Sequence, residues 1–121
     1  MEEPEAKKHG LAHLVAAGGY SMAGFKRALG ESAFRHEIIF FVGAIILFAA
    51  IGATLGEYVG LAIIFLLMLG VEALNTAIEE LVDRVSPEVS RTGKHAKDLG
   101  SFAVFCTIVA AVIYIAYVVI L

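Results

Sequence analysis

The sequence predicts an all-α integral membrane protein, with one amphipathic N-terminal helix on the membrane surface followed by three transmembrane helices. First, 60% of the 121 residues are hydrophobic and 17% are charged, whereas a soluble domain is about 25% charged. Second, the apolar residues form three blocks, each as long as the roughly 20 residues that a membrane span needs. Third, apolar residues recur at the spacing of an α-helix ahead of the first block. The length allows a single membrane domain, residues 1–121.

Residues 8–30 form the expected surface helix. Its apolar side chains recur at steps of three or four residues and its polar face is basic, as in helices that lie in the membrane interface. The repeating residues are Leu11, Leu14, Val15, Gly18, Met22, Phe25 and Leu29. A soluble helix packed on a polar loop is the alternative interpretation. Gly18, Gly19 and Gly24 weaken any helix, so a break is also consistent with the pattern.

The three spans are expected at residues 31–55, 58–84 and 97–121. Only a turn around Gly56 and Glu57 separates the first two spans, which therefore form a tight hairpin. The spacing of Gly52, Gly56 and Gly60 indicates a close approach of helices. A polar loop, residues 85–96, connects the second and third spans.

The distribution of charge predicts the orientation in the membrane. All nine Lys and Arg residues lie at or before the start of the first span, or in and beside the polar loop, and the hairpin turn has none. The positive-inside rule therefore places the N-terminus of this multi-span membrane protein in the cytoplasm. The polar start "MEEPEAKKHG" has no apolar core followed by a cleavage site, so we expect no cleaved signal peptide.

The second span ends in an acidic stripe, within "VEALNTAIEELVDR". At 100° per residue, Glu72, Glu79 and Asp83 fall within about 40° of one another, with Asn75 beside them. An unpaired charge at membrane depth costs at least about 2.5–3.5 kcal/mol, so the stripe requires cations, water or partner helices. Acids that simply face water at a helix end are the alternative. This alternative suits Asp83 better than Glu72 and Asn75, which precede the end of the apolar pattern.

Two ion pairs are expected on helix surfaces, Glu80 with Arg84 and Glu31 with Arg35, each four residues apart. Glu31 and Glu79 should also lie at one depth, because their helices start and end at the cytoplasmic interface. Two carboxylates at that depth suit Mg²⁺, which takes one or two carboxylates together with substrate phosphates and waters.

The motif "HAKDLG" places Lys97 and Asp98 at the expected start of the third span. Backbone amides at a helix N-terminus, together with Lys97, can hold phosphate oxygens. The alternative is that Asp98 caps the helix and Lys97 anchors it at the interface. The stretch "RTGKHA" is not a P-loop, since it lacks the upstream Gly and the following Ser or Thr.

Four motifs, "AGGYSMAG", "ESAFRHE", "VEALNTAIEELVDR" and "KHAKDLGSFAV", occur in an order that resembles the prokaryotic diacylglycerol kinase family of small integral membrane lipid kinases. The resemblance covers the chain from about His13 onward. It implies a homotrimer with active sites between neighbouring chains at the cytoplasmic interface. It also implies transfer of the γ-phosphate of ATP, with Mg²⁺, to diacylglycerol, forming phosphatidic acid. No nucleic acid partner is expected.

The resemblance further implies roles for individual residues. Glu72 matches the general base that takes the lipid hydroxyl proton, Asn75 supports that site, and Glu31 and Glu79 match the metal-binding carboxylates. The residues matched to the nucleotide site are His13, Tyr20, Glu31, Glu79, Glu88, Ser90, Lys97 and Asp98. His13 stands where relatives carry an arginine. The residues matched to the lipid site are Ser21, Phe34, Arg35, Glu37, Glu72 and Ser101.

Two alternatives concern the function. A related branch phosphorylates undecaprenol, a long polyprenol, although "AGGYS", "ESAFRHE" and the Arg84 after Asp83 look more like the diacylglycerol branch. The alternative from another class is a small membrane transporter that uses Glu72 as its proton or cation site. Transporter acids are expected near the membrane midplane, whereas Glu31 and Glu79 are both expected on the cytoplasmic side.

Overall fold

The structure, a computed structural model, describes residues 9–121 as an all-helical chain. Its four helices are α1 (Gly10–Ala28), α2 (Ser32–Ile51), α3 (Leu55–Val85) and α4 (Arg91–Ile120). The basic residues Lys7 and Lys8, which entered the orientation argument, lie outside the described residues. α2, α3 and α4 are each long and apolar enough to cross a membrane. The expectation of three helices that can span a membrane is therefore confirmed.

The hairpin turn lies earlier in the chain than the sequence predicts. α2 ends at Ile51, because Gly52 adopts the left-handed conformation (φ 70°) that closes many helices. Thr54 then caps α3: its hydroxyl oxygen accepts a hydrogen bond from the Glu57 N–H, and the Glu57 carboxylate accepts one from the Thr54 N–H. Gly56, which we expected in the turn, is already helical.

The polar loop is also shorter than expected. α4 begins at Arg91, six residues before the predicted boundary at 97. Its cap is Ser90, whose hydroxyl oxygen accepts a hydrogen bond from the Gly93 N–H at 3.0 Å. Asp98 therefore does not cap the helix but lies about two turns inside it. Residues 91–96 are polar although they are helical, so their hydropathy resembled that of a loop.

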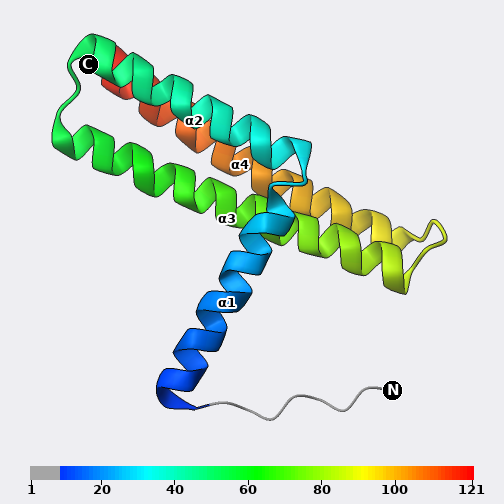
Figure 1. The fold of residues 1–121 in the computed structure, drawn as a ribbon. Helices are drawn as coiled ribbons and strands as arrows, with labels where there is room; N and C mark the ends of the chain where they lie inside the picture. The colour runs from blue at the N-terminus through cyan, green and yellow to red at the C-terminus, as the bar shows by residue number, and fades with distance from the viewer. Residues whose placement is uncertain (1–8) are drawn as a thin grey trace.

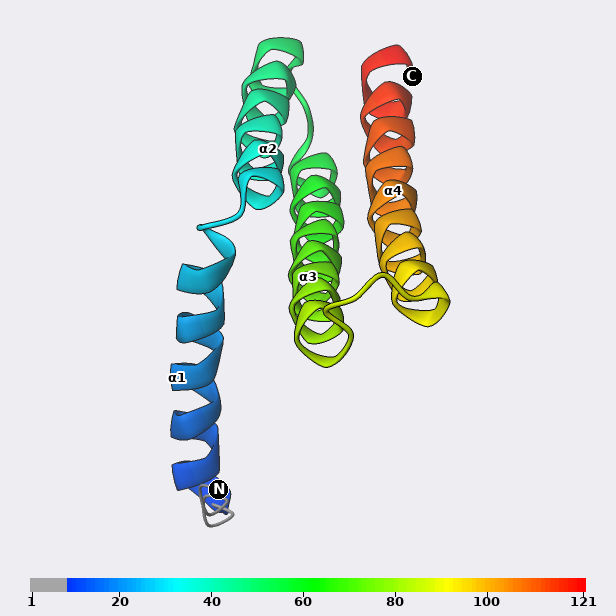
Figure 2. The ribbon, with the colours of Figure 1, turned by 90° about the vertical axis from the view of Figure 1, so that its right-hand side faces the viewer.

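Figures 1 and 2 show α2, α3 and α4 side by side, with α1 running away from this three-helix bundle. α3 packs extensively on α4 and also on α2, whereas α1 meets α3 only near its own C-terminal end, where Ala28 is buried. Although glycines interrupt its sequence, α1 is one continuous helix through Gly18, Gly19 and Gly24.

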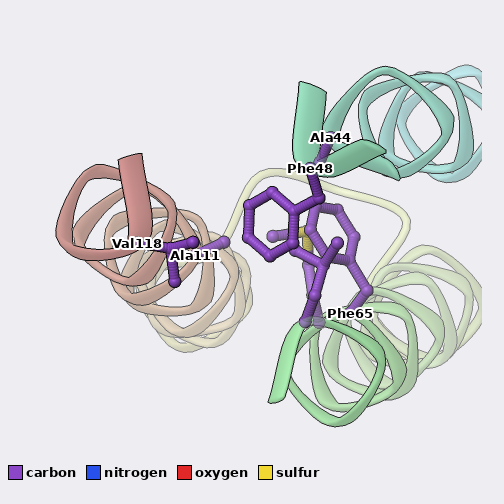
Figure 3. Close-up of a cluster of buried hydrophobic side chains, with 7 residues drawn as sticks. Ala44, Phe48, Phe65, Ala111 and Val118 are labelled. Carbon is purple, nitrogen blue, oxygen red and sulfur yellow. The ribbon is translucent and has the colours of Figure 1, made fainter. Parts of the chain in front are cut away.

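The core of the bundle is formed by large side chains of α2 and α3 that face small ones of α4. Phe48, Leu61, Phe65 and Met68 are fully buried. Figure 3 shows Phe48 and Phe65 pointing toward each other from α2 and α3, with Ala111 and Val118 of α4 facing them. Small residues on α4 allow its backbone to come close, as is common between helices in membranes.

The close approach predicted from the glycine series is confirmed at Gly60. A Cβ atom at this position would overlap the Tyr114 side chain of α4. The Tyr114 hydroxyl passes over Gly60 and donates a hydrogen bond of 2.7 Å to the backbone carbonyl of Glu57. This contact joins α3 and α4 at the hairpin end of the bundle, opposite the polar loop.

Candidate active site

The polar residues of α3 face the bundle in its second half. Glu72, Asn75 and Thr76 are all buried, although each follows a strongly apolar stretch of the helix. Thr76 satisfies its hydroxyl within the helix by donating to the Glu72 carbonyl at 3.1 Å. Asn75, by contrast, keeps a buried oxygen, Oδ1, for which the described residues supply no donor. The burial of Glu72 and Asn75 therefore points to a role beyond packing.

Glu72 faces a second buried acid, Glu37 of α2. Glu72 is 5% exposed and Glu37 is 8% exposed. Two ionised carboxylates offer each other only acceptors, and the Glu37 Oε2 oxygen has no donor among the described residues. If both carboxyl groups were ionised, they would repel each other across this buried position. Both acids line a cavity of about 390 Å³ whose remaining wall is mostly apolar, including Phe40, Met68 and Val104.

Asn75 connects the buried acids to Glu79. Its Nδ2 group donates to Glu79 Oε1 at 3.2 Å, while its Oδ1 atom is buried without a hydrogen-bond donor among the described residues. Gly100 of α4 lies directly against that oxygen, since a Cβ atom on Gly100 would overlap it. Because Gly100 has no side chain, the Asn75 amide fits against the backbone of α4. This contact brings the motif "VEALNTAIEE" of α3 against "KDLGS" of α4.

Glu31 joins the same region from the connection between α1 and α2. It stands at the N-cap position of α2, but its side chain makes no capping hydrogen bond. The carboxylate instead pairs with Arg27 at 2.9 Å. Glu31 and Glu79 both act electrostatically on Glu72, so the three acids converge on one region although they come from two segments of the chain.

Two predicted ion pairs are wrong. Glu80 pairs with Arg27 of α1, whose Nε donates to Glu80 Oε1 at 2.8 Å, and not with Arg84. Arg35 donates to the Leu29 carbonyl at 2.8 Å and does not pair with Glu31. Glu80 and Arg35 thus bind to residues at the C-terminal end of α1, and not to the partners four residues away that the sequence predicts. Hydrogen bonds to Glu31 and Glu80 raise the pKa of the Arg27 guanidinium, which stays charged.

A polar cavity of about 230 Å³ lies between the end of α3, the loop and the start of α4. Four of the residues that we matched to the nucleotide site line it together: Glu88, Ser90, Lys97 and Asp98. Lys97 pairs with Asp83 at 2.7 Å, and Lys94 pairs with Asp98 at 2.7 Å. Lys97 also interacts electrostatically with Glu79, which connects this cavity to the acidic region.

The remaining predicted residues are dispersed. Ser21 and Phe34 line a third, largely apolar groove of about 740 Å³ between α1, α2 and α3, and Phe34 packs edge-on against Phe25. His13, Tyr20 and Ser101 are exposed and line none of these three cavities. Arg35, as described above, braces the connection between α1 and α2.

Sequence reasoning missed Arg27, Glu80, Lys94 and Gly100 as parts of the site. The four-residue spacing of Arg27 and Glu31 was visible, but the partner Glu80 is 53 residues away and left no local signal. Lys94 was visible as a basic loop residue. Its position on the cavity follows from the early start of α4, which the sequence did not show.

The fold and the site define an all-helical protein with membrane-spanning helices, buried carboxyl groups in one cavity and lysines in a second, polar cavity. A family model for prokaryotic diacylglycerol kinase matches residues 19–119. Similar proteins named diacylglycerol kinase occur in a Sinorhizobium species (61% identical, covering 97% of this chain and 85% of the relative), in Pseudomonas aeruginosa (44%, 79% of each) and in Escherichia coli (36%, 86% of each). The chain belongs to the prokaryotic diacylglycerol kinase family. It is a membrane lipid kinase, and a kinase takes its phosphate from a nucleotide donor.

Proposed function

We propose that this protein transfers the γ-phosphate of ATP to the free hydroxyl of diacylglycerol, forming phosphatidic acid. The observation that carries the proposal is the buried Glu72 in an apolar-walled cavity at the acidic end of the bundle. Such a cavity suits a lipid whose hydroxyl must meet a carboxylate beside its acyl chains. The names of the three relatives support diacylglycerol over undecaprenol as the acceptor.

Glu72 is the proposed general base. Its carboxylate accepts the proton of the lipid hydroxyl while the lipid oxygen bonds to the γ-phosphorus, and ADP departs with the bridging oxygen. Phosphoryl transfer depends mainly on positioning and charge stabilisation, so one base with cations and a metal is sufficient. Glu37 faces Glu72 across the cavity and is the proposed lipid-side partner that shares its proton. Asn75 supports the site by orienting Glu79.

The carboxylates fit Mg²⁺ as a partial ligand set. Among residues 9–121, no group of three or more His, Cys, Asp or Glu side chains is arranged to hold a metal ion alone. Mg²⁺ takes one or two carboxylates plus phosphate oxygens and waters, which matches Glu31 and Glu79 near Glu72. We therefore assign the metal to these two residues. When bound, Mg²⁺ neutralises charge on the phosphate oxygens.

The nucleotide is assigned to the polar cavity at the start of α4. Lys97, Asp98, Ser90 and Glu88 line it, and Lys97 interacts with both Asp83 and Glu79. Phosphate oxygens would replace Asp83 as the partner of Lys97. His13 and Tyr20 do not line this cavity within one chain, which supports completion of the site by a neighbouring chain in a homotrimer.

The proposed environment is the cytoplasmic face of a bacterial inner membrane, with α1 on the membrane surface. The exposed apolar residues of α1, including Leu11, Leu14 and Val15, support contact with lipid. The basic residues of the described chain cluster around the start of α2 and the 86–90 loop, which supports a cytoplasmic N-terminus.

ATP-dependent phosphorylation of diacylglycerol and undecaprenol, measured side by side in mixed micelles, tests the proposal. We expect strong preference for diacylglycerol. Glu72→Gln should retain the trimer, measured by cross-linking, and lose turnover by at least about 10²-fold, as expected for a general base. Full activity of this variant would remove the base assignment. A preference for undecaprenol would keep the site and change the lipid.

A further inference from the structure

A short connection between α1 and α2 carries Glu31, the proposed metal ligand that is not on α3. Residues 29–31 form this connection, and the Leu29 carbonyl accepts from Arg35. Side chains at an N-cap position usually accept hydrogen bonds from the first-turn amides of their helix. Glu31 does not do this, although it stands at the N-cap of α2. Its carboxylate is directed to Arg27 instead.

Arg27 bridges two acids from different parts of the chain. Its Nη2 atom lies 2.9 Å from Glu31 Oε1, and its Nε atom donates to Glu80 Oε1 at 2.8 Å, with a second contact from Nη2. Glu80 directly follows Glu79 on α3. The guanidinium therefore connects Glu31 to the residue beside the second proposed metal ligand. The planar fork of Arg suits such a bridge, and a lysine ammonium would not reproduce its geometry.

Global stability does not explain this arrangement. The side chains of Arg27, Glu31 and Glu80 are 50%, 36% and 55% exposed, and exposed ion pairs contribute little to stability. Orientation of Glu31 is a better explanation, because partners behind a metal ligand fix its direction and tune its affinity. Glu80 also balances the charge of Arg27, so that the guanidinium repels a cation at Glu31 less strongly.

We propose that Arg27 and Glu80 are positioning residues, which hold the Glu31 carboxylate in place for the divalent cation. The proposal rests on the function proposed above, since it takes Glu31 as a metal ligand. Arg27 and Glu80 also line the apolar groove that contains Ser21 and Phe34, so metal affinity, and not turnover alone, is the measure of a positioning role. Substitution of Arg27 or Glu80 should weaken the affinity for the divalent cation. Turnover should fall only because the cation is bound less tightly.

Binding of Mn²⁺, measured as the loss of the free-ion electron paramagnetic resonance signal with a non-hydrolysable ATP analogue, is the direct test. In the full-length protein in micelles, Arg27→Gln and Glu80→Gln should each weaken Mn²⁺ binding by about 10-fold, the low end of the effect expected for such partners. Saturating Mg²⁺ should restore lipid phosphorylation in both variants. Lys26→Gln removes a neighbouring charge of α1 that has no ion pair within residues 9–121, and should leave Mn²⁺ binding unchanged.

The double charge reversal Arg27→Glu with Glu80→Arg separates positioning from tethering. It keeps an ion pair between α1 and α3 but leaves Glu31 without its guanidinium, so we expect Mn²⁺ binding to stay weak. Restored binding would show that tethering alone is responsible and would overturn the proposal. Unchanged or tighter binding in Arg27→Gln would also overturn it, since Arg27 would then be inert or a competitor of the cation.

The Glu31→Gln variant distinguishes the failure of this inference from that of the proposed function. If Glu31→Gln abolishes Mn²⁺ binding while Arg27→Gln and Glu80→Gln have no effect, the metal site stands and only the positioning role falls. If Glu31→Gln has no effect, or the wild-type protein binds no Mn²⁺ with nucleotide, the metal assignment and the positioning role fall together.

Discussion

The contact between Glu37 and Glu72 is the strongest chemical feature at the scale of single residues. Both carboxyl groups are buried, and the cavity wall beside them is mostly apolar. A buried acid without a hydrogen-bond donor loses about 1–3 kcal/mol. The Glu72 carboxylate can accept a proton from a lipid hydroxyl while the Glu37 carboxyl group stays beside it as a hydrogen-bonding partner.

Replacement of Glu37 tests whether the pair acts as a unit. Glu37→Leu removes the buried carboxyl group that lines the cavity beside Glu72, and we expect lipid phosphorylation to fall about 10- to 100-fold, on the scale of the roughly 1–3 kcal/mol lost with a buried hydrogen-bonding partner. Glu37→Gln should lose less, because its amide can donate to the Glu72 carboxylate. The measurement is kcat in mixed micelles at saturating lipid. Equal activity of Glu37→Leu and the wild type would show that Glu72 works alone.

Gly100 illustrates how a missing side chain positions a polar one. A Cβ atom there would overlap Asn75 Oδ1, and Asn75 holds Glu79. Gly100→Ala should therefore displace Asn75, raise the Mg²⁺ requirement and lower turnover by about 10-fold or more, the range for partners behind a metal ligand. Gly43→Ala is the matched control, because a Cβ atom on Gly43 meets nothing within 4 Å in this chain. Equal effects of the two substitutions would show that helix glycine content, and not Asn75, is responsible.

At the scale of elements, α3 and α4 form the most extensively packed pair of helices in the described part of the chain. They are joined by the Phe65 layer of the core and by the contact of Gly60 with Tyr114. The proposed site lies toward the other end of the same pair, near the loop. The contact of Gly60 with Tyr114 at one end sets the register of α3 against α4, and in this register Asn75 meets Gly100.

Gly60→Ala should destabilise this pair without touching the site. The new methyl group would collide with the Tyr114 ring, and overpacking of this kind costs about 1–3 kcal/mol. We expect a lower midpoint of SDS-induced unfolding in micelles, with lipid phosphorylation near that of the wild type while the protein remains folded. Combination with Tyr114→Ala should recover part of the loss, since the collision disappears. An unchanged midpoint in Gly60→Ala would show that the helices separate easily here.

The elements could be predicted from the sequence, but their ends could not. Long apolar blocks sufficed for three spans, because hydrocarbon leaves few alternatives to a helix. The ends depend on local hydrogen bonds: Gly52 closes α2 and Ser90 opens α4. The polar start of α4 resembled a loop, so Lys94 was not placed on the cavity. Likewise, Arg27 and Glu80 meet through the path of α1, which periodicity does not encode.

At the scale of the whole molecule, the bundle presents large apolar side chains outward. Ile46, Leu66, Leu67 and Ile113 are among the many that are exposed on the three spans. Lipid tails and neighbouring chains are the surroundings that such a surface requires. The acidic residues of the described chain other than Glu57, by contrast, lie in the half of the bundle that contains the polar cavity. This polarity, predicted from the charges in the sequence, makes one end of the bundle the proposed catalytic face.

The orientation of that face is open to a direct labelling experiment. In a Cys106→Ser background, which removes the only cysteine, single cysteines would replace Val89 of the loop and Leu55 beside the hairpin turn, both highly exposed. Because basic residues concentrate at the loop end, a membrane-impermeant maleimide should label Val89→Cys only in inverted inner-membrane vesicles. It should label Leu55→Cys only in right-side-out vesicles. The opposite pattern would place the site outside, where no cytoplasmic nucleotide reaches it. The kinase would then need a different donor, and the assignment of the polar cavity to ATP would be wrong.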